Sequence, residues 1–136
     1  MTLTDAERAE ALITIRRGLD EDLRYGPDIT TIATVPADQV STAAMVSRAD
    51  GVAAGIDVAL LTLDEVLGAD GYRVLGRADD GDRLRRGDAL LTLEADTRGL
   101  LTAERTMLNL VCHLSGIATA TSHWVDAVDG TRARMD

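Results

Sequence analysis

The chain has 136 residues, 46% of them hydrophobic, and a formal net charge of −9. This length suffices for one ordinary domain with a buried core, and the apolar content is typical of a globular rather than a disordered protein. The negative charge and the lack of any long run of basic residues exclude a nucleic-acid-binding surface built on clustered positive charge.

The cysteine count and the apolar segments indicate the cellular compartment in which the protein is expected. Cys112 is the only cysteine, which excludes an internal disulfide and a thiolate zinc cluster, and its apolar surroundings in the sequence predict a small packed side chain. The first twenty residues lack the apolar centre of a signal peptide, and no run of 18 apolar residues could span a membrane. We therefore expect a cytoplasmic protein without membrane contact.

The first half of the chain predicts a helix, a connector and two extended segments. Thr4 and Glu7 have the spacing of a capping box, and apolar residues then recur at helical intervals with Gly18 as a possible end. Residues 20–31 are acidic and turn-rich and predict a loop. Residues 42–48 predict a strand, and Gly51 and Gly55 enclose a second short strand or a bend.

The middle of the chain predicts a helix followed by a strand pair. Residues 57–67 place leucines and a valine on one helical face, and Gly68 follows as a C-terminal cap. Residues 72–77 and 88–96 predict two strands that are joined by a polar turn. Helices combined with short strands in this order favour an α+β fold.

A long helix is predicted from residue 97 to about residue 130, with a kink or restart at Ser115–Gly116. After it, residues 131–135 alternate like a strand. At 100° per residue, one stripe of this helix is apolar except for a single carboxylate. The stripe consists of Leu100, Leu101, Glu104, Met107, Leu108 and Val111.

Glu104 and Arg105 are the candidate site residues. A carboxylate within an apolar stripe needs a hydrogen-bonding or charged partner, and an Arg on the flank of a helix can bind a carboxylate or phosphate of another molecule. The alternative is that Glu104 forms a cap or salt bridge within the fold while Arg105 is solvated. His113 and His123 are ten residues apart, which does not fit a helical metal pair and favours surface positions.

Four segments resemble quinolinate phosphoribosyltransferases, the nicotinate-nucleotide pyrophosphorylases (carboxylating) of NAD biosynthesis, and the actinobacterial members most of all. The resemblance implies an N-terminal α/β sandwich domain at residues 1–110, followed at residues 111–136 by the truncated start of an α/β barrel. The segments are residues 21–31 (EDLRYGPDITT), 51–59 (GVAAGIDVA), 87–121 (which contains ERTMLNLVCHLSGIAT) and 124–134 (WVDAVDGTRAR).

The resemblance also implies an activity. Enzymes of this family are pentosyltransferases that convert quinolinate and phosphoribosyl pyrophosphate, with Mg²⁺, to nicotinate mononucleotide, pyrophosphate and CO2. They act as homodimers or higher homo-oligomers in which the sandwich domain of one subunit closes the barrel site of the other. Arg105 matches the arginine that binds the quinolinate carboxylate in trans, and we interpret Glu104 as a buried supporting partner.

The family's later motifs, which hold Mg²⁺ and the ribose, do not occur in this sequence. We therefore expect no catalytic residue and no metal ligand within the chain, and no activity from it alone. Two other functions stay open: a related phosphoribosyltransferase that acts on nicotinate itself, and a non-catalytic binding or regulatory module derived from the enzyme. The exposed end of the long helix is expected to fray or to self-associate.

Overall fold

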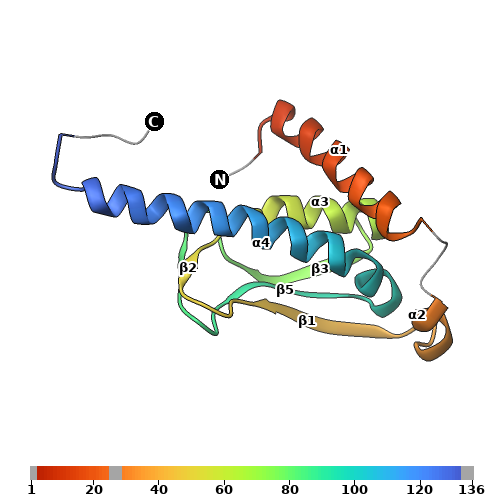
Figure 1. Ribbon diagram of the computed structural model, residues 1–136. Helices are drawn as coiled ribbons and strands as arrows, with labels where there is room; N and C mark the ends of the chain where they lie inside the picture. Colours follow the sequence, from red (N-terminus) through yellow and green to blue (C-terminus); the bar gives the residue numbers. More distant parts are fainter. Residues whose placement is uncertain (1–2, 25–28, 133–136) are drawn as a thin grey trace.

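A computed structural model describes residues 3–24 and 29–132, apart from the side chains of residues 29 and 30. The described residues form four helices and five strands in an α+β fold, the class that the sequence predicts, although α2 and β4 were not predicted (Figure 1). No helix within these described residues is both long and apolar enough to cross a membrane. The elements are α1 (Asp5–Asp22), α2 (Ile29–Thr34), β1 (Val40–Val46), β2 (Gly51–Val52), α3 (Ile56–Leu67), β3 (Tyr72–Arg77), β4 (Arg83–Leu84), β5 (Ala89–Asp96) and α4 (Thr97–Val128).

An antiparallel sheet in the order β1-β5-β3 forms one layer of the molecule. β5 is its central strand, and Leu91, Leu93 and Ala95 alternate along one face and are buried. The two predicted strands at residues 72–77 and 88–96 are confirmed as β3 and β5. The turn predicted between them contains a further short strand, β4, which pairs with β2 in a separate two-stranded sheet.

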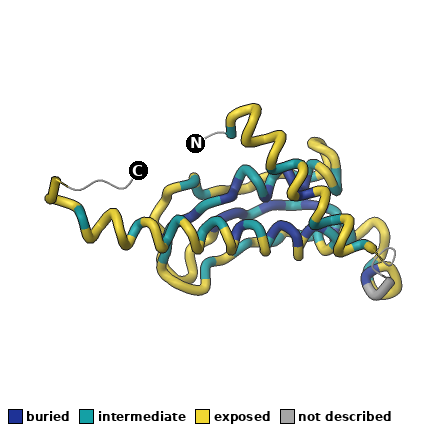
Figure 2. Tube along the Cα trace, turned by 45° about the horizontal axis from the view of Figure 1, so that its top comes forward, coloured by how far each residue is buried: buried dark blue, intermediate teal, exposed yellow. Residues whose placement is uncertain are grey.

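Helices α3 and α4 cover one face of the sheet, and α1 packs across them on the side away from the sheet (Figure 1). The core lies between the sheet and these two helices, where the tube in Figure 2 is darkest. It is built from aliphatic side chains of both layers, among them Ile56 and Leu63 of α3 and Met107 and Val111 of α4.

Helix α1 begins at the predicted capping box but ends later than predicted. The Thr4 hydroxyl accepts a hydrogen bond from the Glu7 amide, and the Glu7 carboxylate accepts one from the Thr4 amide. The helix continues through Gly18 to Asp22. Gly18 lies at the crossing with α4, where an added Cβ would be 3.0 Å from Thr106 Cγ2. The glycine therefore permits a close helix contact and does not end the helix.

The acidic segment 20–31 was predicted as a loop, and the prediction is wrong at both ends. Residues 20–22 belong to α1, and α2 begins at residue 29; residues 25–28 lie outside the described part of the chain. Arg98, in the first turn of α4, donates to the carbonyls of Val35 and Ile32 at 2.7 and 2.9 Å. This side chain therefore binds the C-terminal end of α2 from 63 residues away in sequence.

Helix α3 receives its N-terminal cap from a distant residue. Gly55 precedes it with a left-handed φ of 86° and has no side chain to cap it. The two carboxylate oxygens of Asp80 accept from the amides of Gly55 and Ile56, at 3.1 and 3.0 Å. At the other end Gly68, with φ 81°, follows the last helical residue as the sequence predicts.

Helix α4 runs through Ser115–Gly116 without a break, so the predicted restart is wrong. The Ser115 hydroxyl bonds to both the amide and the carbonyl of Ala54, each at 3.0 Å, and the Thr119 hydroxyl accepts from the Val52 amide at 2.9 Å. These side chains form hydrogen bonds with backbone groups in and next to β2, and α4 remains a continuous helix. Residues 131 and 132 are bends, and the rest of the strand predicted at 131–135 lies outside the described residues.

Candidate functional site

Arg105 lies on the exposed edge of α4, next to the line along which α4 crosses α1. The helix is capped at its start by Asp96, whose side chain accepts from the Gly99 amide at 2.8 Å. Thr106 is buried against Gly18 of α1, whereas the neighbouring Arg105 side chain is 77% exposed. The fold therefore holds the backbone of Arg105 rigidly and leaves its guanidinium accessible to another molecule.

An open cavity of about 570 Å³ lies between α1 and α4 beside this guanidinium. Arg105 Nη1 is 3.7 Å from Asp22 Oδ1, an ion pair that occupies only a part of the five donors of the guanidinium. A solvated, forked donor at the edge of a cleft can bind a carboxylate or phosphate with two parallel hydrogen bonds. The cavity is lined by Thr14, Arg17, Gly18, Glu21, Asp22, Arg105, Thr106, Asn109 and Leu110.

Glu104 is exposed, so its interpretation as a buried partner is wrong. The buried face of α4 is rotated from the predicted stripe, because Thr97, Ala103 and Thr106 are buried and Leu101 is 38% exposed. Small residues let α4 pack against α3 and α1 as well as the sheet, and a pattern that counts only large apolar side chains misses those contacts. Glu104 instead borders an apolar cavity of about 250 Å³ between α4 and strands β1 and β5.

Glu104 has no hydrogen-bond or ion-pair partner within the described part of the chain, and no residue of the fold orients it. The predicted role of Glu104 in supporting Arg105 therefore stays a prediction, and no contact within the described residues supports it. Arg105, by contrast, has the exposure and the flank position that its predicted role requires.

The remaining sequence candidates lie on the surface. His113 and His123 are exposed, as predicted. Cys112 is also exposed, so the prediction of a packed thiol is wrong; it is one of the residues that line a larger open cavity. That cavity has a volume of about 740 Å³ and lies between α4 and the segment from β1 to β2.

The described residues contain no group of three or more His, Cys, Asp or Glu side chains that could hold a metal ion. The acidic residues near Arg105 therefore do not fit a Mg²⁺ site. Magnesium stays an expectation that the sequence resemblance implies for residues outside this chain.

Two features of the structure were not predicted from the sequence: the structural role of Ser115 and Thr119, and the pairing of Asp22 with Arg105. Two hydroxyls four residues apart on a helix were a usable signal for the first, because they share one face. For the second, the signal was a run of acidic residues at the end of α1. Neither signal identifies its partner, since Ala54 is 61 positions from Ser115 and Arg105 is 83 positions from Asp22 in the sequence.

Comparisons with known proteins match this chain to one family. The chain spans less than half the length of the relatives described below. Residues 28–115 match the family model described as quinolinate phosphoribosyl transferase, N-terminal domain. The chain is 67% identical over 133 residues to the nicotinate-nucleotide pyrophosphorylase (carboxylating) of Mycobacterium leprae, which covers 98% of this chain and 47% of that protein. A probable nicotinate-nucleotide pyrophosphorylase (carboxylating) of Methanothermobacter thermautotrophicus is 44% identical, over 79% of this chain and 37% of that protein.

Solved structures agree with the fold. The structure of NadC from Streptococcus pyogenes superimposes with a TM-score of 0.85 and 30% identity, covering 98% of this chain and 46% of that one. The nicotinate-nucleotide pyrophosphorylase of Francisella tularensis gives a TM-score of 0.80 with 28% identity, over 90% of this chain and 43% of that one.

Proposed function

Because this chain belongs to the quinolinate phosphoribosyltransferase family through that family's N-terminal domain, we propose that it serves the reaction of quinolinate with phosphoribosyl pyrophosphate. The products are nicotinate mononucleotide, pyrophosphate and CO2, in the biosynthesis of NAD. In this proposal the chain forms the N-terminal domain of one subunit in a homodimer or higher homo-oligomer, and it closes the site of a partner subunit.

The exposed guanidinium of Arg105 is the observation that carries the proposal. Quinolinate is a pyridine diacid, and a carboxylate matches the forked geometry of an Arg better than that of a Lys. Arg105 is 77% exposed at the edge of α4, and its only ion-pair partner within the described residues is Asp22 at 3.7 Å. A side chain placed in this way is free to reach a ligand that another subunit holds.

The chain's own contribution is to bind and orient the substrate. A fixed positive charge beside a carboxylate holds the diacid in place while its ring nitrogen attacks the ribose carbon, and pyrophosphate leaves. The pyridinium formed in this step then stabilises the carbanion left by loss of CO2. No described residue of the chain is assigned to proton transfer or to metal binding. The chain spans 47% of the Mycobacterium leprae relative, and we expect it to be inactive by itself.

A chimaera tests this function. Residues 1–136 of this chain replace the matched segment of the Mycobacterium leprae protein, which is 67% identical. We expect the chimaera to form nicotinate mononucleotide. The Arg105→Ala variant should lose about ten- to a hundredfold in kcat/KM for quinolinate, as expected for removal of a hydrogen-bonded charge. Arg105→Lys should recover only part of the loss, because a lysine cannot make the forked contact.

Arg85→Ala is the matched control, because it removes an exposed arginine that forms no ion pair with any described residue. It should leave both KM and kcat unchanged. A folded, active chimaera in which Arg105→Ala has the quinolinate kcat/KM of the parent would contradict the proposal. A chimaera that folds but forms no product would favour the non-catalytic module, and one that prefers nicotinate would favour the related phosphoribosyltransferase.

A further inference from the structure

The last turn of α1 carries a cluster of negative charges at the C-terminal end of the helix, where negative charge is unfavourable. Asp20, Glu21 and Asp22 are consecutive, and the turn contains no basic residue. The C-terminal end of a helix carries a partial negative charge, so each carboxylate there is destabilising unless a cation lies close by. The last turn itself supplies no such cation, and α4 places one beside it.

Arg105 of α4 supplies that charge to Asp22. Gly18 lies one turn before Asp22, and its contact with Thr106 brings the two helices close together at this point. Asp22 Oδ1 consequently lies 3.7 Å from Arg105 Nη1, with the Asp22 side chain 25% exposed. The Asp22 side chain is thus the less exposed member of the pair, and the guanidinium is the more exposed one.

We propose that Asp22 is a positioning residue for Arg105. It holds the guanidinium against the end of α1 so that its unpaired donors project from the α1–α4 cleft toward an approaching carboxylate. This inference rests on the proposed function, because it assigns Asp22 a role in the same contact with quinolinate.

The physical effect is a reduction in the freedom that Arg105 loses on binding. An exposed Arg samples many rotamers, and fixing it in a complex has an entropic cost. The ion pair with Asp22 lowers this cost, because it already favours the rotamers in which the free donors of Arg105 project from the α1–α4 cleft. An exposed ion pair is itself worth little, so we expect an effect on quinolinate KM of about two- to fivefold and no larger. The contact persists in the transition state, so kcat should stay unchanged.

The test uses the chimaera described above. Asp22→Asn keeps the shape of the side chain and removes its charge, and it should raise the quinolinate KM about two- to fivefold with kcat unchanged. Asp22→Glu should restore the parent KM, because its carboxylate can still reach Arg105. Asp20→Asn is the matched control: it removes the same charge from the same turn, yet Asp20 forms no ion pair with any described residue.

A double-mutant cycle separates this inference from the proposed function. In the Arg105→Ala background, Asp22→Asn should no longer change KM, since its partner is gone. An equal change in both backgrounds, an equal effect of Asp20→Asn, or an unchanged KM in Asp22→Asn would each overturn the positioning role. A failure of Asp22→Asn to fold where Asp20→Asn folds would also count against it, because the pair would then act on stability. If Arg105→Ala itself has no effect, the proposed function fails first.

Discussion

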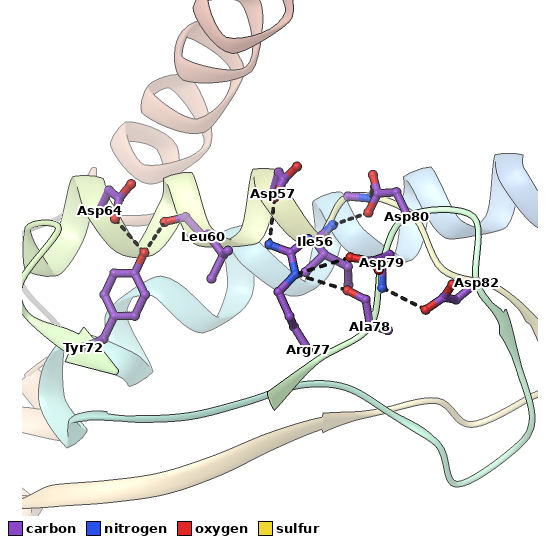
Figure 3. A network of polar contacts seen from close by, with 11 residues as sticks. Ile56, Asp57, Leu60, Asp64, Tyr72, Arg77, Ala78, Asp79, Asp80 and Asp82 are labelled. Carbon is purple, nitrogen blue, oxygen red and sulfur yellow. Dashed lines mark hydrogen bonds and ion pairs between the residues drawn. The ribbon is translucent and has the colours of Figure 1, made fainter. Parts of the chain in front are cut away.

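Tyr72 at the start of β3 shows how one polar atom is satisfied between the sheet and α3. Its hydroxyl donates to Asp64 Oδ1 at 2.6 Å and lies 3.3 Å from the carbonyl oxygen of Leu60 (Figure 3). Burial of the phenol, and after it the hydrogen bond to the Asp64 carboxylate, raises the pKa of Tyr72 above its ordinary value. The tyrosine therefore stays protonated in the folded chain where an unfolded chain would have ionised it.

This raised pKa predicts a loss of stability at high pH. Above about pH 10 the unfolded chain releases the phenolic proton while the folded chain retains it, so the unfolded state binds fewer protons and the free energy of unfolding falls as pH rises. The stability that Tyr72 contributes is fully present below the unfolded pKa. We expect the free energy of unfolding in urea to fall more between pH 9 and pH 11 for the parent chain than for Tyr72→Phe.

Tyr72→Phe should also lower the free energy of unfolding at neutral pH by about 1 kcal/mol, because Asp64 loses its hydrogen-bond donor. Tyr25 is present in both proteins, so its own titration cancels in the difference. Identical pH dependence in the two proteins would show that Tyr72 ionises as freely in the folded state as in the unfolded state.

Single residues differ in how far the sequence alone defines them. The flank position of Arg105 could be predicted from its helical phase, whereas its role at the quinolinate carboxylate was implied only by the resemblance of the segment around it to the family. Glu104 was placed wrongly, because burial of a helix face depends on every element that packs on it. Asp22 could not be paired with Arg105 from the sequence, since the contact depends on the crossing of α1 and α4 at Gly18.

At the scale of elements, Asp80 links the loop after β3 to the start of α3. It accepts two backbone hydrogen bonds that Gly55 has no side chain to accept, as Figure 3 shows for the Ile56 amide. Replacement by alanine should leave both amides without a partner and lower the free energy of unfolding by about 1–2 kcal/mol, the range for loss of an N-cap. Urea denaturation followed by circular dichroism measures the change.

Asp79→Ala is the control for this prediction. Asp79 is the adjacent acidic residue; its side chain is 70% exposed and, within the described part of the chain, makes only a long 4.0 Å contact with Arg77. Its replacement should change the free energy of unfolding by less than about 0.5 kcal/mol, as for most surface substitutions. Equal losses in the two variants would mean that charge in the loop matters and that the cap on α3 does not.

Elements with a strong local pattern were predicted well. β3 matches the predicted residues 72–77, and α3 and β5 start within one residue of their predicted first positions. Elements that depend on remote partners were not predicted: α2 is anchored by Arg98, and the end of α1 is decided by packing at Gly18. The division of the chain at residue 110 stays a prediction, and α4 runs through that position as one helix.

Across the whole molecule, α4 joins a packed region to a poorly covered one. Its first half contributes Ala103, Met107 and Val111 to the core, whereas Ile117 and Trp124 in its second half are 53% and 65% exposed. Figure 2 shows the same change from dark to light along the helix. Stability should therefore decrease along α4 toward its C-terminal end.

Beyond the hydrogen bond between Thr119 and Val52, an ion pair joins the last turns of α4 to the rest of the fold. Arg83 of β4 binds Asp126 with two hydrogen bonds, at 2.9 and 3.2 Å, and this contact lowers the pKa of Asp126. A carboxylate with a lowered pKa contributes to stability above its ordinary pKa and loses that contribution as pH falls. The pair is therefore fully formed at neutral pH, where its removal can be tested.

Amide hydrogen exchange at neutral pH tests this distribution of stability. Arg83→Gln removes the pair, so exchange at residues 120–128 should accelerate about two- to fivefold, the effect expected for an exposed ion pair, while exchange at residues 103–111 stays as in the parent chain. Arg85→Gln makes the same chemical change in the same loop at a side chain without an ion-pair partner in the described chain, and should alter neither region. Equal protection of residues 120–128 and 103–111 in the parent chain would contradict the prediction that stability decreases along α4.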